Sequence, residues 1–201
     1  MKLAKATATI ILACLAVSAW AEEQLLPENA FTGKSVRYHE NGSLKKCKLR
    51  IPTVVQGYPC QCWLRFYPSG RLKELRLSES KRIQGIEIPR KSVVFFRSDG
   101  LLDHCWLRKD LTIQGIPCNG GFMKADTGFH RNGKLAYCGL SKSTDIQGIP
   151  CKASPFTNVV FHPSGKLKKC TLSKDHTING TEYGKGTALR FDSAGNVQSS
   201  E

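Results

Sequence analysis

The chain has 201 residues, of which 40% are hydrophobic, and a formal net charge of +14 at pH 7. This length accommodates one domain with a single hydrophobic core. After the N-terminal segment, no apolar run approaches the length of a membrane-spanning helix, which excludes an integral membrane protein once that segment is cut.

The first 21 residues have the organisation of a secretory signal peptide. A basic start with Lys2 and Lys5 precedes an apolar run, and Ala19–Ala21 forms a small–X–small cleavage site. An alternative is a lipobox ending at Cys14, with lipid anchoring there, but the residues after Cys14 stay apolar. We therefore expect an exported chain of residues 22–201, periplasmic or secreted from a bacterium. Loss of the two lysines takes its formal charge from +14 to +12.

Two motifs recur through the rest of the chain. One is Ile-Gln-Gly-Ile-Pro-Cys at 113–118 and 146–151, with weaker copies at 55–60, 83–88 and 178–183. The other follows the pattern aromatic–X–X–(Asn/Ser/Asp)–Gly–X–Leu–X–X–Cys–X–Leu. Its turn glycines recur every 28 to 33 residues, at Gly42, Gly70, Gly100, Gly133, Gly165 and Gly195. Self-similarity of this kind identifies a repeat protein.

The glycine-containing motif predicts a β-hairpin, because Asn, Asp and Gly supply the backbone conformations of a tight reversal. The Leu–X–X–Cys–X–Leu step breaks strict alternation, so we expect a bulge in the second strand. The Ile-Gln-Gly-Ile-Pro-Cys copies predict a further short strand. We therefore predict an all-β fold of tandem antiparallel hairpins, about 5.5 units in one domain, 35–201, after an N-terminal segment at 22–34. The units lie near 35–62, 63–90, 91–121, 122–153, 154–184 and 185–201.

Two stretches, Tyr38–Lys45 and Phe161–Lys168, resemble the variant MORN repeat, a hairpin of the form aromatic–aromatic–X–Asn–Gly–X–Leu–Lys. The resemblance covers about half of each unit. The chain departs from the family in its Ile-Gln-Gly-Ile-Pro-Cys motif, longer period and cysteines. The resemblance implies a meandering antiparallel sheet used for binding. Because the variant occurs in bacterial proteins labelled antitoxin components, it also implies an alternative role as an inhibitor of a protein partner.

Eight cysteines follow Cys14, and an even number in an exported chain predicts disulfides. Three pairs lie thirteen residues apart at matching positions, and the second unit has lost both positions together, as Leu75 and Ile88. We therefore favour staples inside the units, at Cys47–Cys60, Cys105–Cys118 and Cys138–Cys151. The alternative joins neighbouring units through Cys118–Cys138 and Cys151–Cys170, and leaves Cys105 without a partner.

Cys62 and Cys170 remain after the favoured pairing. In an open ribbon they would lie about 30 Å apart, whereas a disulfide requires Cα atoms within about 7 Å. Either the sheet curls until its ends meet, or both thiols are free.

The sequence contains no constellation that predicts catalysis, a cofactor or a metal site. Cys60, Cys62 and the histidines lack a recurring C-X-X-C pair, and the acids do not pair at a spacing that suggests a glycosidase. His104 and His176 each follow an aspartate, but neighbours point to opposite faces of a strand, so we predict no Asp–His dyad. We expect a non-enzymatic protein; a hydrolase of envelope polymers is a weaker alternative.

Basic and histidine side chains are the candidate binding residues. One slot, three residues before the turn glycine, holds His39, His130 and His162, and is either a hairpin flank or a ligand-binding stripe. The cations cluster around the turns, at Lys45, Lys46 and Lys48, at Arg65, Arg71, Lys73 and Arg76, and at Lys166, Lys168 and Lys169.

Successive hairpins would align these cations in rows. Interleaved with Trp63, Tyr67, Trp106 and Tyr137, they would form a basic–aromatic surface. We expect the partner to be an anionic envelope surface or polymer, or a protein, with nucleic acid disfavoured. The plainer alternative is a solvated face that keeps the chain soluble.

Overall fold

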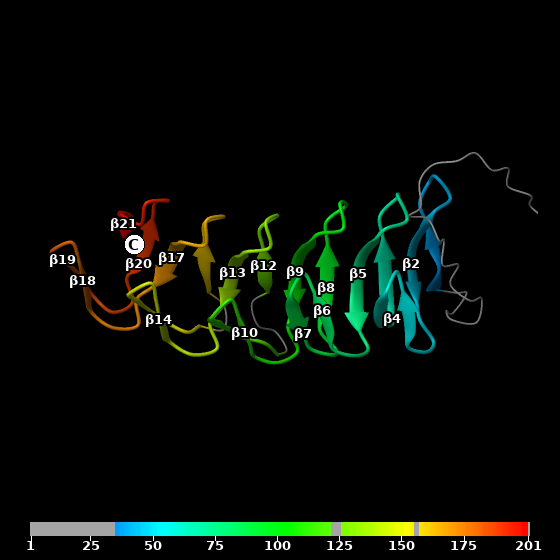
Figure 1. Ribbon diagram of the computed structural model, residues 1–201, viewed down its shortest axis with the longest axis horizontal. Coiled ribbons are helices and arrows are strands. Elements are labelled where there is room, and N and C mark those ends of the chain that lie inside the picture. Colours follow the sequence, from blue (N-terminus) through cyan, green and yellow to red (C-terminus); the bar gives the residue numbers. More distant parts are fainter. Residues whose placement is uncertain (1–34, 122–125, 155–156, 201) are drawn as a thin grey trace, which may run out of the picture.

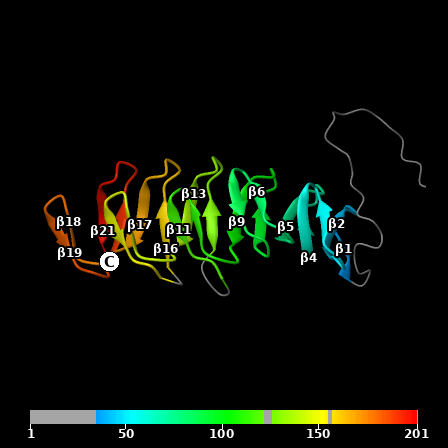
Figure 2. The same ribbon diagram turned by 60° about the horizontal axis from the view of Figure 1, so that its bottom comes forward.

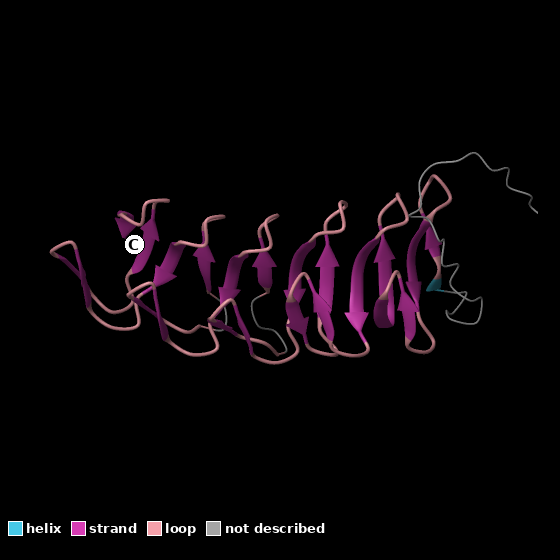
Figure 3. Cartoon of the chain, viewed as in Figure 1, coloured by secondary structure: helices cyan, strands magenta, loops and turns pink. Residues whose placement is uncertain are grey.

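The computed structural model describes residues 35–121, 126–154 and 157–200. The signal-peptide prediction, Cys14 and the segment 22–34 lie outside the described residues. The described chain confirms the predicted all-β class: one long antiparallel sheet runs the length of an extended array, and short hairpins accompany it (Figures 1 and 3). In these three ranges, no helix is long and apolar enough to cross a membrane.

Six long hairpins form the main sheet, and their strands pair in chain order without a crossover. Figure 1 shows these strands lying crosswise to the long axis of the array. Their bounds are β1 (Arg37–Tyr38), β2 (Leu44–Lys48), β4 (Tyr58–Phe66), β5 (Leu72–Leu77), β8 (Val93–Phe96), β9 (Leu102–Trp106), β12 (Thr127–Phe129), β13 (Leu135–Gly139), β16 (Asn158–Phe161), β17 (Leu167–Thr171), β20 (Ala188–Phe191) and β21 (Val197–Ser200).

Five short hairpins come from the Ile-Gln-Gly-Ile-Pro-Cys motif and its weaker copies. They lie along the lower side of the array in Figure 1, the side that comes forward in Figure 2. The first pairs β3 (Thr53–Val55) with the start of β4. The others are β6 (Lys81–Ile83) with β7 (Ile86–Ile88), β10 (Leu111–Ile113) with β11 (Ile116–Cys118), β14 (Thr144–Ile146) with β15 (Ile149–Cys151), and β18 (His176–Ile178) with β19 (Thr181–Tyr183). Six long and five short hairpins make five and a half units, as predicted.

The two kinds of hairpin turn differently. In the first long hairpin, His39 N donates to Ser43 O (2.8 Å) and Gly42 N to His39 O (2.9 Å), with Gly42 at φ 81°. This is the three-residue loop whose last residue is left-handed. In the short hairpins both central residues are left-handed, as at Gln114 (φ 50°) and Gly115 (φ 82°). That geometry is rare for a residue other than glycine.

The predicted bulge is confirmed in all six long hairpins. In the third, Phe95 pairs with His104 but Phe96 pairs with Leu102, which leaves Asp103 as the additional residue. The two residues between the buried leucine and the buried cysteine therefore both lie on the outer face of the sheet.

The core lies between the inner face of the main sheet and the short hairpins. It contains the aromatic and leucine residues of the long strands, isoleucines of the short ones, and a row of buried cysteines. In the second unit Leu75 and Ile88 take the cysteine positions and are also fully buried. Cysteine at these positions therefore packs as a small hydrophobic residue.

Glutamines of three short hairpins join their unit to the next. Gln114 Nε2 donates to Gly133 O (2.8 Å), while its Oε1 accepts from Leu135 N (3.0 Å). Gln56 forms the same two bonds with Gly70 and Leu72, and Gln147 with Gly165 and Leu167. We call each such pair of bonds a glutamine clamp.

The slot of His39, His130 and His162 supplies a second link between units. The Nε2 atom of each lies 3.0 Å from the backbone oxygen of the aromatic residue one unit later, at Phe66, Phe161 and Phe191. Where the slot holds another residue the link persists: Tyr67 Oη donates to Phe96 O (2.7 Å) and Arg97 to Phe129 O (2.6 Å). The slot is therefore a half-buried hairpin flank that connects units.

The predicted staples inside the units are not present. The eight cysteines of the described chain carry free thiols, near one another but not at disulfide distance. The reason is the position of the short strands: Cys118 pairs through its backbone with Leu140, and Cys151 with Leu172, each in the following unit. The spacing of cysteines inside one unit does not show that a short strand lies against the following unit.

The sheet does not close on itself. Cys62 lies on β4 and Cys170 on β17, and six strands of the main sheet separate them. Seven strand spacings of about 4.8 Å each put these residues about 34 Å apart. A disulfide between Cys62 and Cys170 is therefore excluded. Of the two predicted alternatives, a curled sheet and an open ribbon, the structure is the open ribbon.

We predict that Gln114→Ala lowers the free energy of unfolding by about 1–3 kcal/mol, because two hydrogen bonds between units are lost. Gln84→Ala is the matched control: Gln84 has the same left-handed conformation (φ 48°), yet it forms no glutamine clamp with the described residues. Urea unfolding of both variants measures the difference. Equal destabilisation would show that the clamp contributes nothing.

Candidate anion-binding face

The outer face of the main sheet is the side away from the short hairpins. Cross-strand pairing places one row of neighbours on this face. The pairs are Lys46 with Arg65, Arg65 with Glu74, Glu74 with Phe95, and Phe95 with His104. A second row pairs Lys48 with Trp63, and Arg76 with Val93 next to Trp106. Side chains distant in sequence therefore share one surface.

Exposed tryptophans and cations alternate over the N-terminal half of this face. Trp63 and Trp106 are 41% and 53% exposed. The ammonium groups of Lys46 and Lys48 lie 4.2 and 5.8 Å from the Trp63 ring centre, close enough for cation–π attraction. We name as the basic–aromatic face the set Lys46, Lys48, Trp63, Arg65, Arg76 and Trp106.

A hollow of about 330 Å³ lies at the margin of this face. We call it the basic pocket; its lining is Gln61, Cys62, Arg76, Lys91 and Arg108. Its three cations form no ion pair with any described residue, in contrast to Arg65, which binds Glu74 at 3.2 Å. Uncompensated cations around a concave site raise the local concentration of anions.

The backbone shapes the basic pocket. The strand β4 has an irregular register between Gln61 and Arg65, and Cys62 within it is left-handed (φ 65°) and exposed. Lys91 is also left-handed (φ 67°). Gln61 is fixed because its Nε2 donates to Leu77 O (2.7 Å). The pocket therefore rests on main-chain features of three neighbouring strands or their ends, not on one loop.

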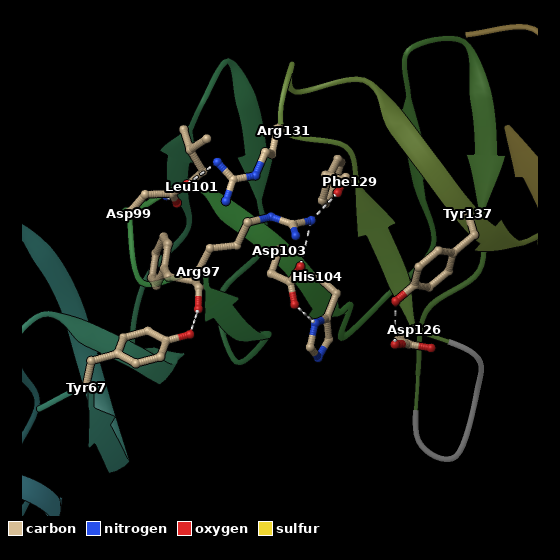
Figure 4. Close-up of polar contacts among 11 residues, drawn as sticks. Tyr67, Arg97, Asp99, Leu101, Asp103, His104, Asp126, Phe129, Arg131 and Tyr137 are labelled. Atoms are coloured by element: carbon tan, nitrogen blue, oxygen red, sulfur yellow. Dashed lines mark hydrogen bonds and ion pairs between the residues drawn. The ribbon is translucent and has the colours of Figure 1, made fainter. Parts of the chain in front are cut away.

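The middle of the outer face contains a polar network (Figure 4). Arg97 binds Asp103 at 2.7 Å, and Asp103 Oδ2 lies 2.9 Å from His104 Nδ1. His104 also stacks on Phe95, with ring centres 4.2 Å apart. The prediction that Asp103 and His104 form no dyad was wrong, because the bulge turns both side chains outward.

This dyad has no adjacent nucleophile: among the described residues, no hydroxyl or thiol is hydrogen-bonded to His104. The other Asp–His sequence, Asp175 and His176, makes a different contact. The Asp175 carboxylate accepts a hydrogen bond from Lys185 N (2.6 Å). Within the described ranges, no group of three or more His, Cys, Asp or Glu side chains is arranged to hold a metal ion.

Tyr137 continues the outer face toward the C-terminus. Its hydroxyl donates to Asp126 Oδ2 (3.1 Å), and burial, together with the nearby Asp126 carboxylate, raises the pKa of Tyr137 to about 12. Its ring lies over Gly128, where any side chain would collide with it. The phenol therefore stays neutral and separates the two ends of the sheet.

The structure divides the predicted basic residues between the two ends of the sheet. Lys45 is exposed at the N-terminal end, near Lys46 and Arg65. Arg71 donates weakly to Ser98 O (3.4 Å), and Lys73 lies 5.5 Å from the Tyr67 ring, both toward the turns. At the other end Lys169 pairs with Arg190 beside exposed Lys168, and Lys166 donates to Ala194 O (3.0 Å).

Sequence reasoning missed the basic pocket apart from Arg76. Lys91 and Arg108 belong to no repeated motif, and Cys62 was treated as a disulfide candidate. The useful signal was the second cysteine of the Cys60-Gln61-Cys62 stretch, which no other unit contains.

We predict that, of the eight cysteines in the described ranges, Cys62 alone is rapidly alkylated in the reduced, folded chain at pH 8. Burial raises the pKa of Cys47 to about 11 and that of Cys105 to about 12. Those thiols therefore remain protonated, and the thiolate is the nucleophile. Iodoacetamide labelling followed by peptide mass mapping gives the test, with urea-unfolded chain as control. Equal labelling of Cys105 and Cys62 would contradict the assigned burial.

Comparisons with protein-family models, with curated proteins and with solved structures find no match to this chain. Inference about function therefore rests on its own residues and their geometry.

Proposed function

We propose that the chain is an exported, non-enzymatic binding module whose basic–aromatic face and basic pocket hold an anionic component of the cell envelope. The observation that carries this proposal is the convergence of Arg76, Lys91 and Arg108, without counter-ions among the described residues, beside the exposed Trp63 and Trp106. The formal charge of +12 that the exported chain keeps, +14 less Lys2 and Lys5, favours the same class of partner.

The two kinds of side chain have separate tasks in this proposal. The cations of the basic pocket bind one phosphate, sulfate or carboxylate group, and the guanidinium groups can do so through two parallel hydrogen bonds. The tryptophan rings contact the adjoining apolar part of the ligand, a sugar face or the region just below lipid headgroups. The stiff sheet holds both in a fixed arrangement, which limits the entropy lost on binding.

We predict that the triple variant Arg76→Ala, Lys91→Ala, Arg108→Ala binds anionic vesicles on the order of 100-fold more weakly, since each cation near such a surface contributes about 1 kcal/mol. The probe is co-sedimentation with vesicles of phosphatidylglycerol and phosphatidylcholine, and dextran sulfate serves as a polymer without lipid. Wild-type binding should weaken steeply with added salt.

A second triple variant, Lys142→Ala, Lys152→Ala, Lys174→Ala, removes the same charge from exposed positions in the C-terminal half of the chain. It should bind nearly as the wild type does. Equal losses in the two variants, or binding that salt does not change, would contradict the proposal. Retention of one acidic protein and of neither probe would instead favour the inhibitor role that the MORN resemblance implies.

A further inference from the structure

Five buried cysteines form a continuous row along the C-terminal part of the core. Cys105, Cys138 and Cys170 lie on successive long hairpins, and Cys118 and Cys151 on the short hairpins between them. All five are at most 1% exposed. Each short-hairpin cysteine therefore has two candidate partners, one in its own unit and one in the next.

The backbone places the short-hairpin cysteines against the following unit. Asn119 N donates to Gly139 O and Ser141 N to Pro117 O, both at 2.8 Å, so two hydrogen bonds flank Cys118 and align it with the end of β13. Lys152 N to Thr171 O and Ser173 N to Pro150 O, also 2.8 Å, repeat this arrangement around Cys151.

The thiol contacts agree with the backbone. The side chains of Cys118 and Cys138 interact with one another, and so do those of Cys151 and Cys170. The backbone bridges of Cys118 with Leu140 and of Cys151 with Leu172 also lead to the following unit. Side-chain and backbone contacts therefore both favour pairing between units.

We propose that oxidation of this chain forms the disulfides Cys118–Cys138 and Cys151–Cys170, which join the third unit to the fourth and the fourth to the fifth, and leaves Cys105 as a thiol. Each bridge forms when two thiols lose two protons and two electrons to an external disulfide, which is reduced to two thiols. Cys105 is left over because Ile88 occupies the position that would be its partner in the preceding unit.

The bridges act where a repeat array is weakest. Units of such an array contact only their neighbours, so the interface between two units limits how far local opening spreads. A covalent link across that interface couples the units in a way that a staple inside one unit does not. Oxidation should therefore raise the urea concentration needed to unfold the C-terminal units.

The test is disulfide mapping of the full-length chain after oxidation with glutathione disulfide. Free thiols are alkylated in denaturant at low pH, where exchange is slow, and unreduced peptides are identified by mass spectrometry. We expect peptides linking Cys118 to Cys138 and Cys151 to Cys170, with Cys105 alkylated. Links of Cys105 to Cys118 and Cys138 to Cys151, with Cys170 alkylated, would overturn the proposal. So would alkylation of all five.

Two single variants provide matched controls, because the two pairing schemes leave different cysteines unpaired. Pairing between units leaves Cys105 as a thiol, and pairing inside the units leaves Cys170. In our proposal Cys105→Ser keeps both bridges, whereas Cys170→Ser keeps Cys118–Cys138 and exposes Cys151 to alkylation. Pairing inside the units predicts the reverse: Cys170→Ser would change nothing and Cys105→Ser would free Cys118. The wild-type map remains decisive if one variant fails to fold.

Discussion

The structure depends on hydrogen bonds that each unit makes with the unit after it. A hairpin of this size cannot bury its apolar face alone, so stacking is required, and the clamps set how neighbouring units stack. Each glutamine clamp is formed by a non-glycine residue in a left-handed conformation, which is unfavourable in isolation. Two bonds to the next turn, at 2.8 and 3.0 Å for Gln114, offset that cost. The His, Tyr or Arg slot adds a further bond at the other side of each turn.

Because the units stack in chain order, none of the described hairpins covers the outer face of the sheet. The clamps and the cysteine row lie on the turn and core sides, and neither covers the outer face. The bulge in each long hairpin doubles the number of residues that reach this face between the buried leucine and cysteine. The same feature that breaks alternation therefore enlarges the surface available for binding, and the register of β4, β5 and β8 gathers cations and tryptophans at one end.

Much of the fold could be predicted from the sequence, because turn glycines, alternation and period are local signals. The bulge and the number of units followed from them. The contact between Asp103 and His104 was missed because strict alternation of side chains was assumed for them. Alternation does not hold at a bulge, and a bulge was expected at this step. The choice between the two cysteine pairings could not be made from the sequence, because spacing within a unit says nothing about which adjacent unit a short strand contacts. The basic pocket could be predicted only with knowledge of the cross-strand register, because Arg76 and Arg108 come close through the pairing of β5, β8 and β9.

Amide hydrogen exchange of the native chain tests the coupling between units most directly. Leu72, Leu135 and Leu167 N donate to a glutamine of the preceding unit, whereas Leu102, the equivalent residue after Gln84, has no such side-chain acceptor among the described residues. The clamps predict slow exchange at the first three amides and markedly faster exchange at Leu102. Equal exchange at all four, or fast exchange at Leu135 and Leu167, would show that the clamps do not hold the units together.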